Sequence, residues 1–512
     1  MKSKTTRRDF LKLASALPLG LAATKTLQKF GIPEQFQNDE QNFLVVVFDA
    51  FSAQHISTYG YQRETTPHLA RLSEQAIIYH NHYASGNFTT SGTASLLTGT
   101  LPWTHRALQN KGILAEPFTT RNIFSALNNH YGIAYTHNPW ADILLGQCEG
   151  VIDELIPRLS LFIKSYDEII HRTFKKDDDI ASLSWLRNTD VNEEGFSYSL
   201  FLSHIYEALR DKQFANLRNE YPRGIPGIGR VENHYLLDQA IVWISDRLTK
   251  IPQPFIGYFH FLPPHGPYYT SIDYIDKFAH DDYMPSAKPW DGFSEGYTEE
   301  ELLKLRNHYD EFILYTDNQF NVFFENLRKS GVLENTWVIF TSDHGEMFER
   351  GIQGHSTDSM YEPVLRVPLM IFEPGRTKGE NIYTPTSALD ILPTLAHLSG
   401  NKSPDWAEGN VLPPFTGKSP DENRGVYAVR ALETRINDPI TRSSIVNVKG
   451  GYKLHYYRGY TDRSLPAELI RLFDIKSDPD ELVDLAGTHK EIASELLDEL
   501  KRKLDVANKP YL

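Results

Sequence analysis

The segment NFLVVVFDA, residues 42–50, limits the possible folds of this chain more than any other segment. Its side chains are apolar without interruption from Phe43 to Phe48, and Asp49 follows them. A strand with one solvated face alternates apolar and polar residues, whereas a strand covered by helices on both faces is apolar throughout. The segment therefore predicts a strand buried on both faces of a parallel sheet.

Similar strand patterns alternate with helical ones along the chain. The predicted strands cover residues 76–84, 254–261, 335–341 and 366–372, and the predicted helices cover residues 65–76, 231–248 and 300–331. This alternation predicts an α/β fold with a large, mostly parallel central sheet flanked by helices.

The pattern changes to shorter segments from about residue 416. We expect an antiparallel sheet there, with Gly450-Gly451 as a hairpin turn, followed by a final helix at 489–504. The predicted domains are a catalytic domain at 42–415, with a mostly helical insertion at 150–235, and a smaller C-terminal α+β subdomain at 416–512.

The first 25 residues differ from the rest. Arg7-Arg8 precede Phe10 and a short, weakly apolar stretch, a pattern typical of a twin-arginine export signal. An amphipathic first helix is the alternative, and residues 26–41 are predicted to be a linker. We expect export to the periplasm or the cell surface, with membrane contact only through this segment if it remains uncleaved.

Charge and cysteine content exclude some functions. The net charge is −14 and no long basic run is present, so nucleic acid is not an expected partner. Cys148 is the only cysteine, which excludes an intramolecular disulfide and a cysteine zinc site.

A hydroxyl-rich segment, NFTTSGTASLLTG at residues 87–99, contains the candidate nucleophile. Thr89 to Ser91 are predicted to supply N-cap hydroxyls for a short helix that ends at Gly99. A helix N-terminus also favours a bound anion. One of these hydroxyls can therefore attack an anionic ester, and a capped surface helix is the alternative interpretation.

Further polar residues follow predicted strands, where open α/β sheets bind ligands. They are Asp49, Asp343 and His344 in TSDHGE, His265 in PPHGP, and His355 in GHS. Two aspartates, a histidine and a hydroxyl suit a divalent metal ion, Zn²⁺ or Mn²⁺ more readily than Ca²⁺. Taken singly, each of these residues also fits a turn or a structural hydrogen bond.

The chain resembles the sulfatase-like branch of the alkaline phosphatase superfamily. The matching segments span roughly residues 41–487 and include NFLVVVFDA, TTSGTASLLTGTLPWTHR, HFLPPHGPY, ENTWVIFTSDHGE, GHS, YEPVLRVPLMI, TSALDILPTL and LFDIKSDPDELVDLA. The resemblance implies an α/β catalytic domain followed by a smaller domain with an antiparallel sheet.

The nucleophile position departs from that of true sulfatases. Their Cys or Ser, which is converted to formylglycine, lies seven residues before the first Leu of LLTG, and this position is Thr89 here. The second acid of sulfatases is Ala50. The site is therefore more similar to that of Thr-nucleophile members, the phosphoethanolamine transferases and lipoteichoic acid synthases.

The resemblance assigns a role to each candidate residue. Asp49, Thr89, Asp343 and His344 hold the metal, and Thr89 is also the nucleophile, with Thr90 as the alternative. His265 and His355 contact the ester oxygens or act on the leaving group.

Three functions remain open. The leading one is hydrolysis or transfer of a phosphoester, most readily a phosphodiester, on an anionic cell-envelope or extracellular substrate. The second is hydrolysis of a sulfate ester without formylglycine. The third is an inactive binding domain.

Overall fold

The computed structural model describes residues 40–163, 212, 214–228, 233–417 and 421–512. The predicted export signal, nearly all of the predicted linker, and residues 164–211 of the predicted insertion lie outside this range. Residues 41–512 form one compact unit. The export signal and the helical insertion therefore stay predictions, as do the domain boundaries.

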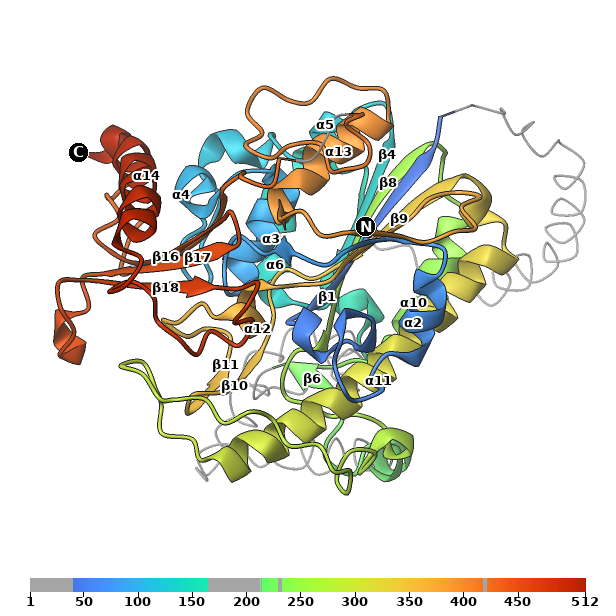
Figure 1. Ribbon diagram of the computed structural model, residues 1–512. Coiled ribbons are helices and arrows are strands. Elements are labelled where there is room, and N and C mark those ends of the chain that lie inside the picture. The colour runs from blue at the N-terminus through green and yellow to red at the C-terminus, as the bar shows by residue number, and fades with distance from the viewer. Residues whose placement is uncertain (1–39, 164–211, 213, 229–232, 418–420) are drawn as a thin grey trace, which may run out of the picture. The chain divides into compact units, whose positions relative to one another are not determined.

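The central sheet confirms the predicted α/β fold. In the described part of the chain it has eight strands, in the order β13-β2-β12-β9-β1-β8-β4-β5 (Figure 1). The three central neighbours β9, β1 and β8 are parallel, as are β8, β4 and β5, whereas β12 runs antiparallel to both β9 and β2. The strand bounds are β1 Asn42–Asp49, β2 Ile77–Tyr79, β4 Tyr131–Thr136, β5 Glu154–Leu155, β8 Phe255–Pro264, β9 Thr336–Thr341, β12 Leu369–Phe372 and β13 Glu380–Ile382.

The uninterrupted apolar run in β1 is explained by burial on both sides. Leu44, Val46 and Phe48 pack into one hydrophobic cluster, and the alternate residues of the strand pack into another on the opposite face. Complete burial of a Val or Phe side chain contributes about 1.5–3 kcal/mol. Both faces of this strand therefore help to hold the helices on the sheet.

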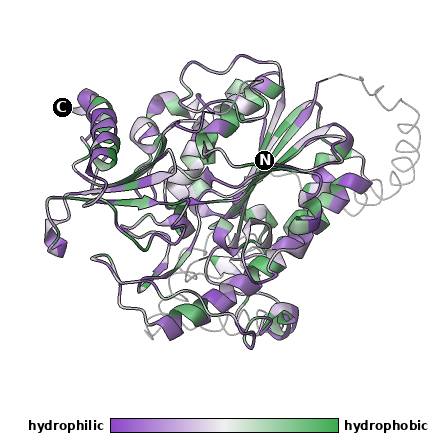
Figure 2. Cartoon of the chain, viewed as in Figure 1, coloured by the Kyte–Doolittle hydropathy of each residue, from purple (hydrophilic) through white to green (hydrophobic). Residues whose placement is uncertain are grey.

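Helices cover the two faces of the sheet. One face packs against α2 (Pro67–Ser73), α10 (Leu237–Leu248) and α11 (Glu299–Lys329). The other packs against α3 (Thr89–Thr98), α5 (Ile123–Ala126), α6 (Pro139–Gln147) and α13 (Ile391–Leu398). The long helix α11 carries both hydrophilic and hydrophobic residues along its length, as expected for a helix with one buried side (Figure 2).

A second, antiparallel sheet lies at the C-terminal end, as predicted. Its strands are β15 (Val426–Leu432), β16 (Arg442–Lys449), β17 (Tyr452–Arg458) and β18 (Glu468–Asp474). The hairpin between β16 and β17 turns at Gly450 and Gly451, whose φ angles of 62° and 89° favour glycine. The final helix α14 (Lys490–Asn508) packs its leucines on this sheet.

The remaining elements connect these layers. Within the described ranges they are β3 His82–Tyr83, α4 Pro102–His105, β6 Gly227–Ile228, β7 Asn233–His234, β10 Met347–Glu349, β11 Ile352–Gly354, α12 Glu362–Leu365, β14 Thr386–Ser387, and ten 3₁₀ turns that include η1 Ala53–His55. None of the helices among the described residues is both long and apolar enough to cross a membrane.

Two local predictions are wrong. The single strand expected at residues 76–84 is split into β2 and β3, which belong to different sheets and are separated by the partly exposed His80 and Asn81. Helix α3 is not capped by its threonines, because its N-cap is Phe88, which makes no side-chain capping bond. Thr89 is instead the first residue of the helix, so its hydroxyl is free for other contacts.

Candidate functional site

The candidate site lies where the central parallel strands end. Asp49 is the last residue of β1, Asp343 follows β9 by two residues, and His260 lies in the neighbouring strand β8. Strand pairing places Val47 of β1 beside both His260 and Thr341. Residues far apart in the sequence therefore meet at one edge of the sheet.

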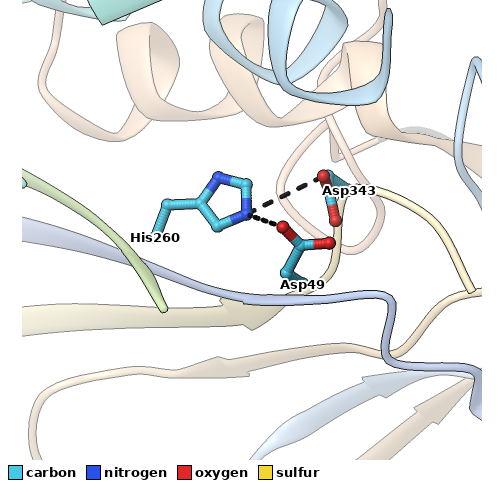
Figure 3. Close-up of side chains that lie close together, drawn as sticks. All are labelled: Asp49, His260 and Asp343. Atoms are coloured by element: carbon cyan, nitrogen blue, oxygen red, sulfur yellow. Dashed lines mark ion pairs between the residues drawn. The ribbon is translucent and has the colours of Figure 1, made fainter. Parts of the chain in front are cut away.

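Two aspartates and two histidines form the centre of this site. His260 Nε2 lies 3.3 Å from Asp49 Oδ2 and 3.8 Å from Asp343 Oδ2 (Figure 3). His344 Nε2 lies 3.3 Å from Asp49 Oδ1 and 3.6 Å from Asp343 Oδ2. All four side chains are fully buried.

This cluster fits a divalent metal ion. Asp49, His260 and Asp343 each offer one ligand atom within 4.8 Å of the others. Asp49 Oδ1 and His260 Nε2 are buried and each faces a neighbour of the cluster at 3.3 Å, but neither contact has the geometry of a hydrogen bond, which is unusual for buried polar atoms. A bound cation would satisfy both atoms.

The two aspartates make the surroundings of His344 negative, which favours a cation. Burial alone would lower the pKa of His344, but the carboxylates of Asp343 and Asp49 outweigh burial and raise that pKa to about 9. His344 Nδ1 lies 3.0 Å from the carbonyl oxygen of Gly345, so this nitrogen donates and Nε2 is left facing the carboxylates. A metal ligand needs this orientation of the ring.

Helix α3 brings the candidate nucleophile to the cluster. Thr89 Oγ1 lies 3.4 Å from His344 Nε2 and accepts a hydrogen bond of 3.2 Å from Asn138 Nδ2. The neighbouring Thr90 hydroxyl is buried and has no hydrogen-bond partner among the described residues. Of these two hydroxyls, Thr89 is therefore the one that contacts the candidate metal ligands.

A close approach of two backbones fixes this arrangement. A Cβ atom added to Gly92 in α3 would lie 2.2 Å from the carbonyl oxygen of Asp343, so the helix and the end of β9 touch at glycine. Ala50 adopts the left-handed region with φ 59°, which is uncommon for a residue with a side chain, and its N–H points to Asp343 Oδ1 at 3.4 Å. The backbone thus holds Asp343 from two sides.

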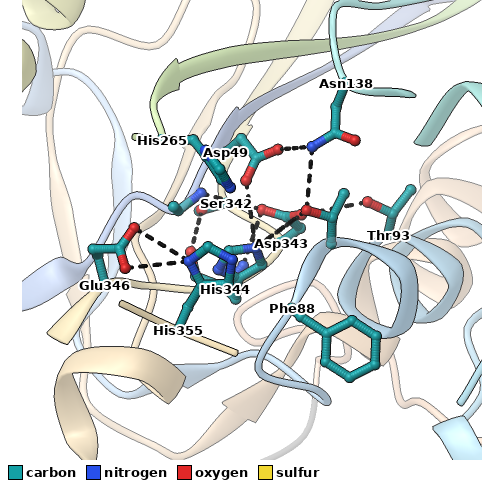
Figure 4. Close-up of polar contacts among 12 residues, drawn as sticks. Asp49, Phe88, Thr93, Asn138, His265, Ser342, Asp343, His344, Glu346 and His355 are labelled. Carbon is teal, nitrogen blue, oxygen red and sulfur yellow. Dashed lines mark hydrogen bonds and ion pairs between the residues drawn. The ribbon is translucent and has the colours of Figure 1, made fainter. Parts of the chain in front are cut away.

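The two remaining predicted histidines lie beside this cluster. The ring of His355 is 4.2 Å from that of His344 and 4.9 Å from that of His265. Both carboxylate oxygens of Glu346 lie 3.2 Å from His355 Nδ1 (Figure 4). Burial raises the pKa of Glu346 to about 7, although His265 and His344 oppose this effect.

The six residues predicted from the sequence are thus brought together, but three neighbours were missed. His260 contacts both aspartates, and Asn138 donates a hydrogen bond of 2.5 Å to Asp49 Oδ2. Thr93 donates to Asp343 Oδ2 at 3.4 Å. Two features of the sequence could have indicated these residues. His260 lies on a buried strand that pairs with β1, and Asn138 follows the end of β4.

Three other acidic residues are structural. Asp310 binds His55, Tyr61 and Arg63. Asp317 accepts the first N–H groups of α2. Asp390 is the N-cap residue of α13 but makes no side-chain capping bond, because its carboxylate pairs with Arg424 and with backbone N–H groups elsewhere.

The chain is similar to known protein families and to characterised proteins. Residues 41–143 and 180–401 match the Sulfatase family, and residues 355–509 match the family described as N-sulphoglucosamine sulphohydrolase, C-terminal. Arylsulfatase K of Xenopus laevis is 27% identical over 300 residues, which cover 52% of this chain and 55% of that protein. The chain thus aligns with about half the length of this relative. Choline-sulfatase of Rhizobium meliloti (strain 1021) is 23% identical and covers 87% of this chain and 82% of that protein.

Solved structures share the fold at low sequence identity. The phosphonate monoester hydrolase of Agrobacterium radiobacter superposes with a TM-score of 0.65 at 19% identity and covers 92% of this chain and 96% of that chain. A 2-O GAG sulfatase superposes with a TM-score of 0.62 at 16% identity, over 92% and 93% of the two chains. Since the Sulfatase match covers more than half of the residues, this chain belongs to the sulfatase family.

Proposed function

We propose that this protein is a metal-dependent hydrolase of sulfate or phosphate esters in which Thr89 occupies the position of the nucleophile. The observation that supports the proposal is the contact of Thr89 Oγ1 with His344 and Asn138, beside the buried pair Asp49 and Asp343. An inactive binding domain would not need to keep a reactive hydroxyl next to two buried carboxylates.

The residues divide into ion-binding, nucleophilic and ester-binding groups. Asp49, His260, Asp343 and His344 would hold a divalent cation. Such a cation lowers the pKa of a neighbouring hydroxyl and neutralises charge on an anionic ester. Thr89 attacks the central atom of the ester, and its position on the first turn of α3 adds backbone N–H groups that favour an anion.

His265 and His355 complete the proposed site. His265 Nδ1 lies 2.6 Å from the carbonyl oxygen of Gly266, and His355 Nδ1 faces Glu346, so both rings keep Nε2 available. Because Nδ1 carries the proton of each neutral ring, Nε2 can bind an ester oxygen or deliver a proton to the leaving alcohol only when the ring holds a second proton. The substrate would then be an anionic ester, as expected from the sequence.

Sulfate esters are the substrate class that family membership favours. Curated relatives of this chain are named as sulfatases, and so are several of the solved structures that share the fold. Hydrolysis would require attack at sulfur by the Thr89 hydroxyl or by water, because Thr89 cannot form formylglycine. This alternative among the three functions therefore gains support from the comparisons.

Phosphoesters are the second candidate, favoured by the threonine itself. A formylglycine hydrate expels sulfate by elimination, whereas a threonine ester has no such route. A phospho-threonine can instead be cleared by attack of water or an acceptor alcohol at phosphorus. The phosphodiester and transferase interpretations rest on this chemistry and stay proposals.

One assay separates these functions. The purified protein is tested for bound metal and for cleavage of p-nitrophenyl sulfate, p-nitrophenyl phosphate and bis-p-nitrophenyl phosphate, as wild type and as Thr89→Ala. We expect one class of ester to be cleaved, with activity lost in Thr89→Ala and bound metal largely retained. Cleavage that survives in Thr89→Ala would refute the role of Thr89, and absence of metal and activity would favour the binding domain.

A further inference from the structure

The segment that carries His355 has no strand or helix of its own. Residues 355–359, the His355 loop, follow β11 and precede α12 as bends and irregular backbone. Loops of this kind are more mobile than the elements that they connect. His355 can keep one position beside His344 only if contacts from outside the loop hold its backbone.

The catalytic domain holds the loop from one side. Asn87, two residues before Thr89, donates from Nδ2 to the carbonyl oxygen of His355 at 2.8 Å and to that of Thr357 at 2.7 Å. Asn87 is fully buried. The entry to helix α3 and the His355 loop are thereby joined directly.

The C-terminal sheet holds the loop from the other side. Arg430 of β15 donates from Nη2 to the carbonyl oxygen of Ser356 at 3.1 Å, and its Nε pairs with Asp358 Oδ1 at 3.1 Å. Ser444 of β16 donates to the carbonyl oxygen of Asp358 at 2.6 Å. Four consecutive carbonyl groups, from residue 355 to residue 358, are therefore bound alternately by the catalytic domain and by the C-terminal sheet.

The pair between Arg430 and Asp358 is well placed to stiffen the loop. The side chains are 15% and 5% exposed, so water competes weakly with the charged hydrogen bond. The guanidinium of Arg430 also lies 5.8 Å from the ring centre of Phe88, the residue before Thr89. Arg463 contacts the second oxygen of Asp358 at 3.2 Å but is 43% exposed.

We propose that Arg430 is a positioning residue for the reaction, acting through the His355 loop. The C-terminal sheet would thus fix the position of His355 in the candidate site through contacts with the His355 loop. The inference rests on the proposed function for the role of His355, but the restraint on the loop can be measured without it.

The first test is a double-mutant cycle. Arg430→Gln is made in the wild-type protein and in His355→Ala, and kcat and KM are measured for the p-nitrophenyl ester that wild type cleaves. We expect Arg430→Gln to lower kcat about 10-fold or more with little change in KM, because a displacement of about 1 Å is costly in catalysis. In His355→Ala the same change should cost less than about 2-fold.

A matched control and a conservative variant complete this test. Arg424 forms an equally buried bidentate pair, with Asp390, but contacts no residue of the His355 loop in the described structure, so Arg424→Gln should leave kcat unchanged. Arg430→Lys keeps the charge near Asp358 and should recover part of the loss. An equal loss from Arg430→Gln in both backgrounds would overturn the proposal.

The second test does not depend on activity. Amide hydrogen exchange is compared for peptides that cover residues 355–359 in wild type, Arg430→Gln and Arg424→Gln. Faster exchange of these peptides only in Arg430→Gln is expected, and equal exchange in all three proteins would overturn the restraint. A protein that cleaves none of the esters would contradict the proposed function, and this second test would still decide whether Arg430 holds the loop.

Discussion

Asn138 has two separate functions, since its two side-chain atoms face different neighbours. Its Oδ1 accepts the N–H groups of Trp140 and Ala141 and so caps helix α6. Its Nδ2 donates to Asp49 and Thr89. One residue therefore fixes a helix and orients both an acid and a hydroxyl of the candidate site.

Replacement by serine separates these two functions. Ser retains the capping oxygen but is too short to reach Asp49 and Thr89, so Asn138→Ser should lower metal affinity or activity about 10- to 100-fold. The measurements are zinc titration and ester hydrolysis. Asn122→Ser, at the N-cap of α5, is the matched control and should leave both unchanged; an equal loss in the control would contradict the assignment.

His105 is a buried histidine away from the cluster. Its Nδ1 accepts the N–H of Ala107, and its Nε2 lies 3.1 Å from Ser95 Oγ, so the neutral ring satisfies both contacts. Burial, with a contribution from Arg106, lowers the pKa of His105 to about 3. An unfolded histidine binds a proton below about pH 6.5, whereas this one does not.

Folding stability should therefore decrease as the pH falls, because the unfolded state gains a proton on His105 that the folded state does not bind. The unfolded state binds the extra proton between pH 6.5 and the low folded pKa, so the contribution is fully present above pH 6.5 and about 2 kcal/mol is lost by pH 5. The free energy of unfolding in urea is measured at pH 7.5 and pH 5.0. The difference between the two values should be smaller by this amount in His105→Gln than in wild type. The exposed His280→Gln should leave the wild-type difference intact.

At the scale of elements, the packing of α3 on the end of β9 decides where Thr89 lies. Gly92 faces the carbonyl oxygen of Asp343, so Gly92→Ala forces the helix away from the sheet. We expect a loss of about 1–3 kcal/mol in stability together with loss of bound metal and activity. Thermal unfolding and metal analysis test this directly.

Gly146 provides the control, in a helix on the same face of the central sheet as α3. It lies in α6, is exposed, and would place a Cβ in open space. Gly146→Ala should stabilise the protein by about 0.5–1 kcal/mol, because alanine favours a helix more than glycine does. If Gly92→Ala behaved in the same way, the close contact with Asp343 would be wrong.

The elements also show what the sequence could predict. The apolar run in β1 was sufficient to predict a doubly covered strand, and the strand ends were sufficient to find Asp49 and Asp343. His260 was missed because strand order is a long-range property, and only the pairing of β8 with β1 brings it to Asp49. The prediction that threonines cap α3 was wrong, because Phe88 is the N-cap and Thr89 contacts His344 and Asn138.

For the whole molecule, the candidate metal is expected to contribute to stability. Asp49 and Asp343 are both buried, and without a cation they are balanced mainly by nearby imidazoles. An ion at 100 times its Kd stabilises the folded state by about 2.7 kcal/mol. Chelation should therefore lower the Tm by a few degrees, which Zn²⁺ or Mn²⁺ should restore better than Ca²⁺.

Asp343→Asn serves as the reference for this measurement. It removes one charge from the cluster, so chelator and added metal should change its Tm much less than that of wild type. An identical response of the two proteins to chelation would mean that any stabilising ion binds elsewhere.

The spread of the site along the chain has a consequence for biosynthesis. Its four candidate metal ligands extend from residue 49, near the beginning of the described chain, to residue 344, more than half-way along it. A nascent polypeptide that has emerged only as far as β8 would present one carboxylate and one imidazole, too few donors to retain an ion. Metal uptake therefore has to wait until β9 pairs with β1, and the compartment in which that strand docks determines which metal the protein acquires.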